Sequence, residues 1–99
     1  MPTAGKPIYR ANAAHQALAP HARKTPEPTD AEMVFRNAIA GPWNPEKGST
    51  WYGLGRNGEI YRFSPANDGT AHFSGMTGAG GLRTEEVPID VRRRLGKLR

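Results

Sequence analysis

The chain has 99 residues, of which 36% are hydrophobic, and this length and composition suit one domain with a small core. It contains no cysteine, which excludes a disulfide framework, a thiolate metal site and thiol chemistry. No apolar run approaches transmembrane length, and the first ten residues, MPTAGKPIYR, lack the apolar region of a signal peptide, so we expect export to depend on a carrier outside this chain.

The net charge of +5 is concentrated at the two ends of the chain. Residues 1–24 contribute +4 and residues 83–99 contribute +3, whereas residues 25–50 contribute −2 and residues 51–82 are neutral. A small domain with basic ends is typical of proteins that bind a polyanion, and nucleic acid is the first candidate. The alternative is that the charge serves solubility alone.

Residues 1–28 are rich in proline, which predicts a loosely ordered basic arm before a domain that spans residues 29–99. Within the arm, residues 12–18 (NAAHQAL) have the composition of a short helix. His15 and His21 also lie here, but their spacing, without nearby carboxylates, is a weak indication of a metal site. We therefore expect no metal and no cofactor.

The clearest helix signal covers residues 29–40. Thr29 and Glu32 have the spacing of a capping box, in which each side chain satisfies the backbone N–H of the other residue. An apolar stripe at helical spacing predicts that this helix packs against a sheet, and a Gly-Pro pair at residues 41–42 should end it. The stripe consists of Ala31, Val34, Phe35, Ala38 and Ile39.

Residues 43–50 (WNPEKGST) are predicted to form a loop, because Pro45 and Gly48 interrupt regular structure. Lys47, followed by Gly-Ser-Thr, is a candidate for a phosphate contact. The spacing is not that of a P-loop, so this candidate depends on the lysine itself.

Residues 51–75 (WYGLGRNGEIYRFSPANDGTAHFSG) carry the clearest strand and turn pattern of the chain. Residues 56–58 (RNG) predict a tight turn, because Asn and Gly tolerate positive φ. Residues 59–63 alternate in a β-rich composition, and residues 70–74 predict a return strand after a second turn at residues 65–69. We expect a small curled antiparallel sheet.

The register of this hairpin decides which side chains meet. A five-residue turn would pair Arg62 with His72. A four-residue turn would instead pair Phe63 with His72 and Tyr61 with Ser74. Both registers place the histidine beside cationic or aromatic neighbours.

The last part of the chain predicts a turn and a helix. Residues 76–81 (MTGAGG) should form a flexible turn and lack the pattern of a dinucleotide site. Pro88 suits the first position of a helix whose apolar face would hold Val91, Leu95 and Leu98. The basic residues around that face are favourable near a helix C-terminus in any case, so nucleic-acid contact would be an additional role.

This set of residues suits one chemistry in particular. Cleavage of RNA without a metal needs a base for the 2′-hydroxyl proton, an acid for the leaving 5′-oxygen and a cation for the charged transition state. Histidine can act as acid or base, arginine binds phosphate oxygens, and aromatic rings stack on splayed bases. The predicted catalytic residues are His72, Arg62, Tyr61 and Glu59. The predicted phosphate- or RNA-binding residues include Arg56, Lys47 and Ser74.

A purely structural role is the alternative for each of these residues. Glu59, Arg62 and His72 could be ordinary exposed residues of a half-solvated sheet, and for Tyr61 and Phe63 a core role is favoured over base stacking. A metal nuclease would need a richer cluster of carboxylates and histidines. A deaminase would need cysteine-bound zinc, and covalent catalysis by a serine would need a nucleophile elbow.

The same stretch resembles the C-terminal toxin domains of bacterial polymorphic toxins, which Rhs-type, contact-dependent inhibition and type VI-exported proteins carry. The resemblance covers residues 43–95 and rests on the motifs W-Y/F-G, G-x-I-Y-R and N-D/x-G and on the histidine that follows them. The arginine-rich ending RRRLGKLR departs from that pattern.

The resemblance implies a ribonuclease with a small α+β fold of the barnase–EndoU–colicin–RelE type, in which helices precede a curled antiparallel sheet. The residues that fill the matching positions are Tyr61, Arg62, Asn67 and His72. It also implies an acidic cognate immunity protein, and delivery by a bacterial secretion system into the cytoplasm of a target cell.

The sequence therefore predicts a monomeric α+β domain, a metal-independent endoribonuclease toxin of interbacterial competition that cleaves tRNA or rRNA and has no membrane partner. Two alternatives remain: a nucleic-acid-binding module without catalytic activity, and a protein-interaction domain. ADP-ribosyl transfer is a more distant one, indicated faintly by PIYR near the start.

Overall fold

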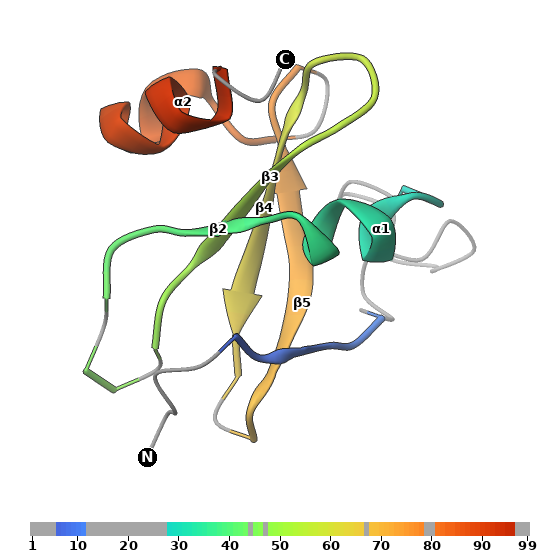
Figure 1. Ribbon diagram of the computed structural model, residues 1–99, viewed down its shortest axis with the longest axis vertical. Helices are drawn as coiled ribbons and strands as arrows, with labels where there is room; N and C mark the ends of the chain where they lie inside the picture. The colour runs from blue at the N-terminus through green and yellow to red at the C-terminus, as the bar shows by residue number, and fades with distance from the viewer. Residues whose placement is uncertain are drawn as a thin grey trace.

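The computed structural model describes residues 6–11, 28–43, 45–46, 48–66, 68–78 and 81–96 (Figure 1). In chain order its elements are β1 (Ile8–Tyr9), α1 (Ala31–Arg36), β2 (Ile39–Ala40), β3 (Trp51–Leu54), β4 (Ile60–Pro65), β5 (Thr70–Met76), the 3-10 turn η2 (Thr84–Glu86) and α2 (Ile89–Gly96). Neither α1 nor α2 has the length and apolar character that a membrane crossing would need.

The five strands form one mixed sheet in the order β1-β5-β4-β3-β2 (Figure 1). β1 runs parallel to β5, and the other neighbours are antiparallel. This arrangement confirms the general expectation of an α+β domain with a small sheet. The expectation of a purely antiparallel sheet is wrong, because β1, from the predicted arm, pairs with β5 in parallel. The likeness to the barnase–EndoU–colicin–RelE type stays a prediction.

The turn between β4 and β5 is shorter than either predicted length. Asp68 Oδ1 accepts hydrogen bonds from the backbone N–H of Thr70 at 3.1 Å and from its hydroxyl at 2.6 Å, and Gly69 has a φ of +82°. The N–H of Ala66 donates to the carbonyl of Thr70 at 2.8 Å, so strand-like bonding continues beyond β4. Ala66 and Thr70 therefore bound the turn.

Because of this tight turn, both predicted registers of the hairpin are wrong. His72 pairs with Ser64 rather than with Arg62 or Phe63. Side chains on a strand alternate between the two faces, so His72 and Ser64 lie on the same face as Arg62.

A β-bulge interrupts the same hairpin two residues further along. Phe63 pairs with Phe73, but the next residue towards the start of β4, Arg62, pairs with Gly75. Ser74 is therefore the extra residue of β5. Gly75 has a φ of +146°, a backbone conformation that other residues rarely adopt.

An aromatic cluster packs between α1 and one face of the sheet. Phe35 of α1 meets Phe63 with ring centroids 5.1 Å apart, in an edge-to-face arrangement. The helix approaches β3 so closely that a Cβ at Gly53 would lie 2.5 Å from Val34 Cγ1. The buried members of the cluster are Ala31, Val34, Phe35, Ala38, Tyr61, Phe63, Ala71 and Phe73.

A second, smaller core lies between α2 and the other face of the sheet. Val91 and Leu95 of α2 are buried, as the sequence predicts, and they pack with Tyr52 of β3. Val87 and Leu82 complete the buried part, while Leu98 lies outside the described residues. In Figure 1, α2 lies over one end of the sheet near β3.

Helix α1 is shorter than predicted and lacks the predicted capping box. It begins at Ala31 and ends at Arg36, its N-cap is Asp30, and no side chain caps its first turn. The reason is tertiary: the Asp30 carboxylate accepts a bond from a sheet tyrosine, and Ile39–Ala40 leave the helix to pair with β3.

Part of the predicted N-terminal arm belongs to the sheet. Ile8–Tyr9 form β1, in which the N–H of Ile8 donates to the carbonyl of Gly69 at 3.1 Å. Residues 12–27, with the predicted short helix and both arm histidines, lie outside the described residues.

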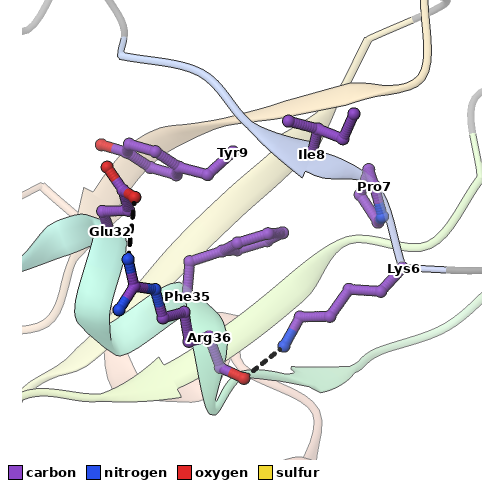
Figure 2. Close-up of a pocket in the computed structure, with 7 residues that line it drawn as sticks. All are labelled: Lys6, Pro7, Ile8, Tyr9, Glu32, Phe35 and Arg36. Atoms are coloured by element: carbon purple, nitrogen blue, oxygen red, sulfur yellow. Dashed lines mark hydrogen bonds and ion pairs between the residues drawn. The ribbon is translucent and has the colours of Figure 1, made fainter.

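Lys6 links β1 to the end of α1. Its ammonium donates to the carbonyl of Arg36 at 2.9 Å and lies 5.0 Å from the ring centroid of Phe35 (Figure 2). It also donates to the carbonyl of Ala38 at 3.1 Å and lies 5.2 Å from the ring centroid of Trp51. Partial burial lowers the pKa of Lys6. The carbonyls and ring faces replace part of the water that this ammonium loses.

We expect Lys6→Met to lower the free energy of unfolding by roughly 1–3 kcal/mol, because it removes two hydrogen bonds to a charged donor and a cation–π contact. Urea denaturation measures the effect. Arg10→Gln is the matched control, since Arg10 flanks β1 on the other side and pairs with Asp68 at 3.4 Å in a solvent-exposed contact that contributes little to stability. Equal losses in the two variants would contradict the role of Lys6.

Tyr61 fixes the start of α1 to the sheet. Its hydroxyl donates to Asp30 Oδ1 at 2.9 Å, and its ring lies so close to Gly55 that a Cβ there would be 2.7 Å from Tyr61 Cε1. Burial is the main cause that raises the pKa of Tyr61, and the bond to Asp30 raises it further.

We expect Tyr61→Phe to lower the free energy of unfolding by about 1 kcal/mol at neutral pH and to weaken its dependence on alkaline pH. A phenol whose pKa is raised by folding stabilises fully below the pKa of the unfolded phenol, about 10, and this stabilisation is lost as the pH rises. The wild-type chain should therefore lose stability more steeply than the variant above pH 10, in urea titrations at a series of pH values. Parallel curves would show that Tyr61 titrates alike in the folded and unfolded states.

Candidate active site

Four polar side chains form a row on the α2 side of the β4–β5 hairpin. They are half-exposed, whereas their neighbours along the strands are buried against α1. The row consists of Arg62 and Ser64 from β4 and His72 and Ser74 from β5. The alternation of the two strands places all four on one face.

The β-bulge positions the guanidinium of Arg62. Nε donates to Ser74 Oγ at 3.1 Å, and Nη2 donates to the Ser74 carbonyl at 2.7 Å. The hydroxyl of Ser64 donates to Ser74 Oγ at 2.6 Å, which holds the serine in place. The side chain of Arg62 is still 32% exposed, so the guanidinium is fixed and accessible to solvent.

His72 lies at the other end of this row. As the cross-strand partner of Ser64, it has its Cβ about 4.5–5.5 Å from that of the serine. Arg62 is the diagonal neighbour, at about 7–8 Å. His72 and Arg62 therefore occupy diagonal positions on the same face of the hairpin.

Two further residues adjoin Arg62 that the sequence did not single out. Glu86 of η2 lies 3.9 Å from Arg62 Nη1 and accepts a bond from Arg83 Nε at 3.0 Å. The bond from Arg83 lowers the pKa of Glu86, with a smaller contribution from the charge of Arg62, so the carboxylate is ionised at neutral pH. Tyr52 pairs with Arg62 across β3 and β4 and is buried, which raises its pKa.

The remaining predicted residues lie elsewhere or outside the described part of the chain. Tyr61 is 4% exposed on the opposite face, in the α1 core. Glu59 and Arg56 sit at the β3–β4 turn, where both of their charges act on the Tyr61 hydroxyl. Lys47 and Asn67 are not among the described residues. The structure thus brings together Arg62, Ser74 and His72. It separates them from Tyr61, Glu59 and Arg56.

The pocket in Figure 2 lies on the α1 side, between β1 and α1. It has a volume of about 410 Å³, the rings of Tyr9 and Phe35 form part of its lining, and the Glu32–Arg36 ion pair lies across one side at 3.3 Å. It contains none of the predicted site residues. In the described ranges, no group of three histidines, aspartates or glutamates is arranged to hold a metal ion.

Comparison of the chain with protein-family models, with curated proteins and with solved structures finds no significant match in any of the three. The geometry of the row is therefore read from this chain alone. The relation to polymorphic toxins stays a resemblance that rests on the motifs of residues 43–95.

Proposed function

We propose that this chain is a metal-independent endoribonuclease that cleaves RNA by acid–base catalysis. The observation that carries the proposal is the row on the α2 side of the hairpin. Arg62 is held there by Ser74, and His72 lies beside Ser64 on the same accessible face. A fixed guanidinium suits the negative charge that develops on a phosphodiester, and a histidine titrates in the pH range that proton transfer requires.

In the proposed reaction, the 2′-oxygen of the substrate attacks phosphorus and the bond to the 5′-oxygen breaks, which leaves a 2′,3′-cyclic phosphate. His72 carries one of the two proton transfers, either from the 2′-hydroxyl or to the leaving 5′-oxygen, and water carries the other. Arg62 donates to the non-bridging oxygens, where charge accumulates in the transition state. Glu86 keeps Arg62 oriented between the sheet and η2.

The proposal gives different roles to the other predicted residues. Tyr61 supports the fold and makes no substrate contact, because its hydroxyl is bonded to Asp30 on the opposite face. Arg56 is exposed in the β3–β4 turn and is a candidate for a more distant phosphate contact. Lys47 and Asn67 stay predictions from the sequence.

The biological setting is proposed from the resemblance alone. It comprises a toxin in interbacterial competition, tRNA or rRNA as substrate, delivery by a secretion system, and an acidic immunity protein that covers the basic site. The alternative function is nucleic-acid binding without cleavage, for which Arg62 and the basic ends of the chain suffice and the histidine is unnecessary.

The test is incubation of the purified chain with total RNA and with tRNA, each with and without EDTA. We expect discrete fragments with cyclic-phosphate ends that EDTA does not prevent. His72→Ala should slow cleavage by about 10²–10⁴-fold, because it removes an acid–base group. Gel analysis of the fragments measures the rate.

His15→Ala is the matched control, since it removes another of the three histidines and should leave the rate unchanged. Thermal melts of the two variants establish that both are folded. Full cleavage by folded His72→Ala would overturn the assignment of His72. Intact RNA with tight, salt-sensitive binding would favour the binding module instead.

A further inference from the structure

Helix α2 carries three consecutive arginines whose surroundings differ. Successive residues of a helix are about 100° apart, so Arg92, Arg93 and Arg94 point in three directions. Val91 and Leu95 face the sheet and are buried. Arg93 is exposed and lies on the side away from the sheet, while Arg92 and Arg94 occupy the two flanks.

Arg94 marks the flank that faces the outer edge of the sheet. Its Nη1 reaches the carbonyl of Ala40 in β2 at 3.5 Å, and β2 is the last strand on that side. Arg92, about 200° away around the helix, therefore lies on the opposite flank.

The side chain of Arg92 is anchored to the segment that carries Glu86. Its Nε donates to the carbonyl of Val87 at 3.2 Å, and the side chain is half-buried. Val87 directly follows Glu86, whose carboxylate lies 3.9 Å from Arg62. Within the described part of the chain, Nη1 and Nη2 of Arg92 make no hydrogen bond or ion pair, so their N–H groups remain available for a ligand.

We propose that Arg92 is a second phosphate-binding residue of the site and contacts the phosphate next to the one that Arg62 holds. The inference rests on the proposed function and names part of its substrate contact: the backbone of single-stranded RNA passes between the β4–β5 hairpin and the Arg92 flank of α2. Arg93 and Arg94 take no specific part, although they carry the same charge on the same helix.

The test measures binding rather than cleavage. The probe is a fluorescent single-stranded oligoribonucleotide with 2′-O-methyl groups, which cannot be cleaved because the attacking hydroxyl is blocked. Fluorescence anisotropy at a series of salt concentrations gives the affinity and its salt slope for wild type, Arg92→Gln, Arg93→Gln and Arg94→Gln. All four proteins have the full chain length.

We expect Arg92→Gln to bind the probe about tenfold more weakly and to lower the magnitude of the salt slope by about 0.7, the value for one phosphate contact on a single strand. Arg93→Gln and Arg94→Gln should stay within about twofold of wild type. Arg92→Lys should retain most of the slope, because it keeps the charge but loses the planar fork.

Equal effects of the three Gln variants would overturn the proposal, because they would show a general effect of charge. If Arg92→Lys loses as much of the salt slope as Arg92→Gln does, the role of Arg92 is to bind the Val87 carbonyl. That result would also overturn the proposal. If wild type cleaves RNA and Arg92→Gln binds the probe normally, the inference fails and the proposed function stands. If wild type neither cleaves RNA nor binds the probe, both fail, and an acidic protein becomes the partner to test.

Discussion

The pairing of β4 with β5 is the constraint on which the rest of the structure depends. The tight turn at Asp68 and Gly69 sets the register, and a slip by one residue would move every side chain of the hairpin to the other face. The bulge then adds one residue, so that Met76, three positions after Phe73, still faces the α1 core. Two chemically different faces follow from one short turn and one extra residue.

Much of the local structure could be predicted from the sequence. The turn at residues 56–58 forms with a positive φ at Gly58, and the buried positions of both helices follow the helical period. Hydrophobic period and turn chemistry are properties of neighbouring residues. Both therefore predict the structure correctly wherever no contact with a distant part of the chain competes.

The features that the sequence did not predict all involve residues far apart in the chain. Helix α1 ends before Ile39 because β3, further along the chain, supplies a pairing partner. Half of the candidate site was also missed for this reason. Glu86 reaches Arg62 only after η2 folds back over the sheet, and nothing in the local pattern of η2 indicates that contact.

The contacts of Arg94 and Lys6 with backbone carbonyls also affect the outer edge of β2. The N–H of Gly41 donates to Thr50 in the adjoining segment, so by alternation the carbonyl of Ala40 points away from β3. Arg94 approaches that carbonyl, and Lys6 occupies the carbonyl of Ala38 beside it. An edge strand whose acceptors are covered by cations is a poor template for another chain. The same two side chains therefore protect this margin of the sheet from strand exchange and aggregation between copies.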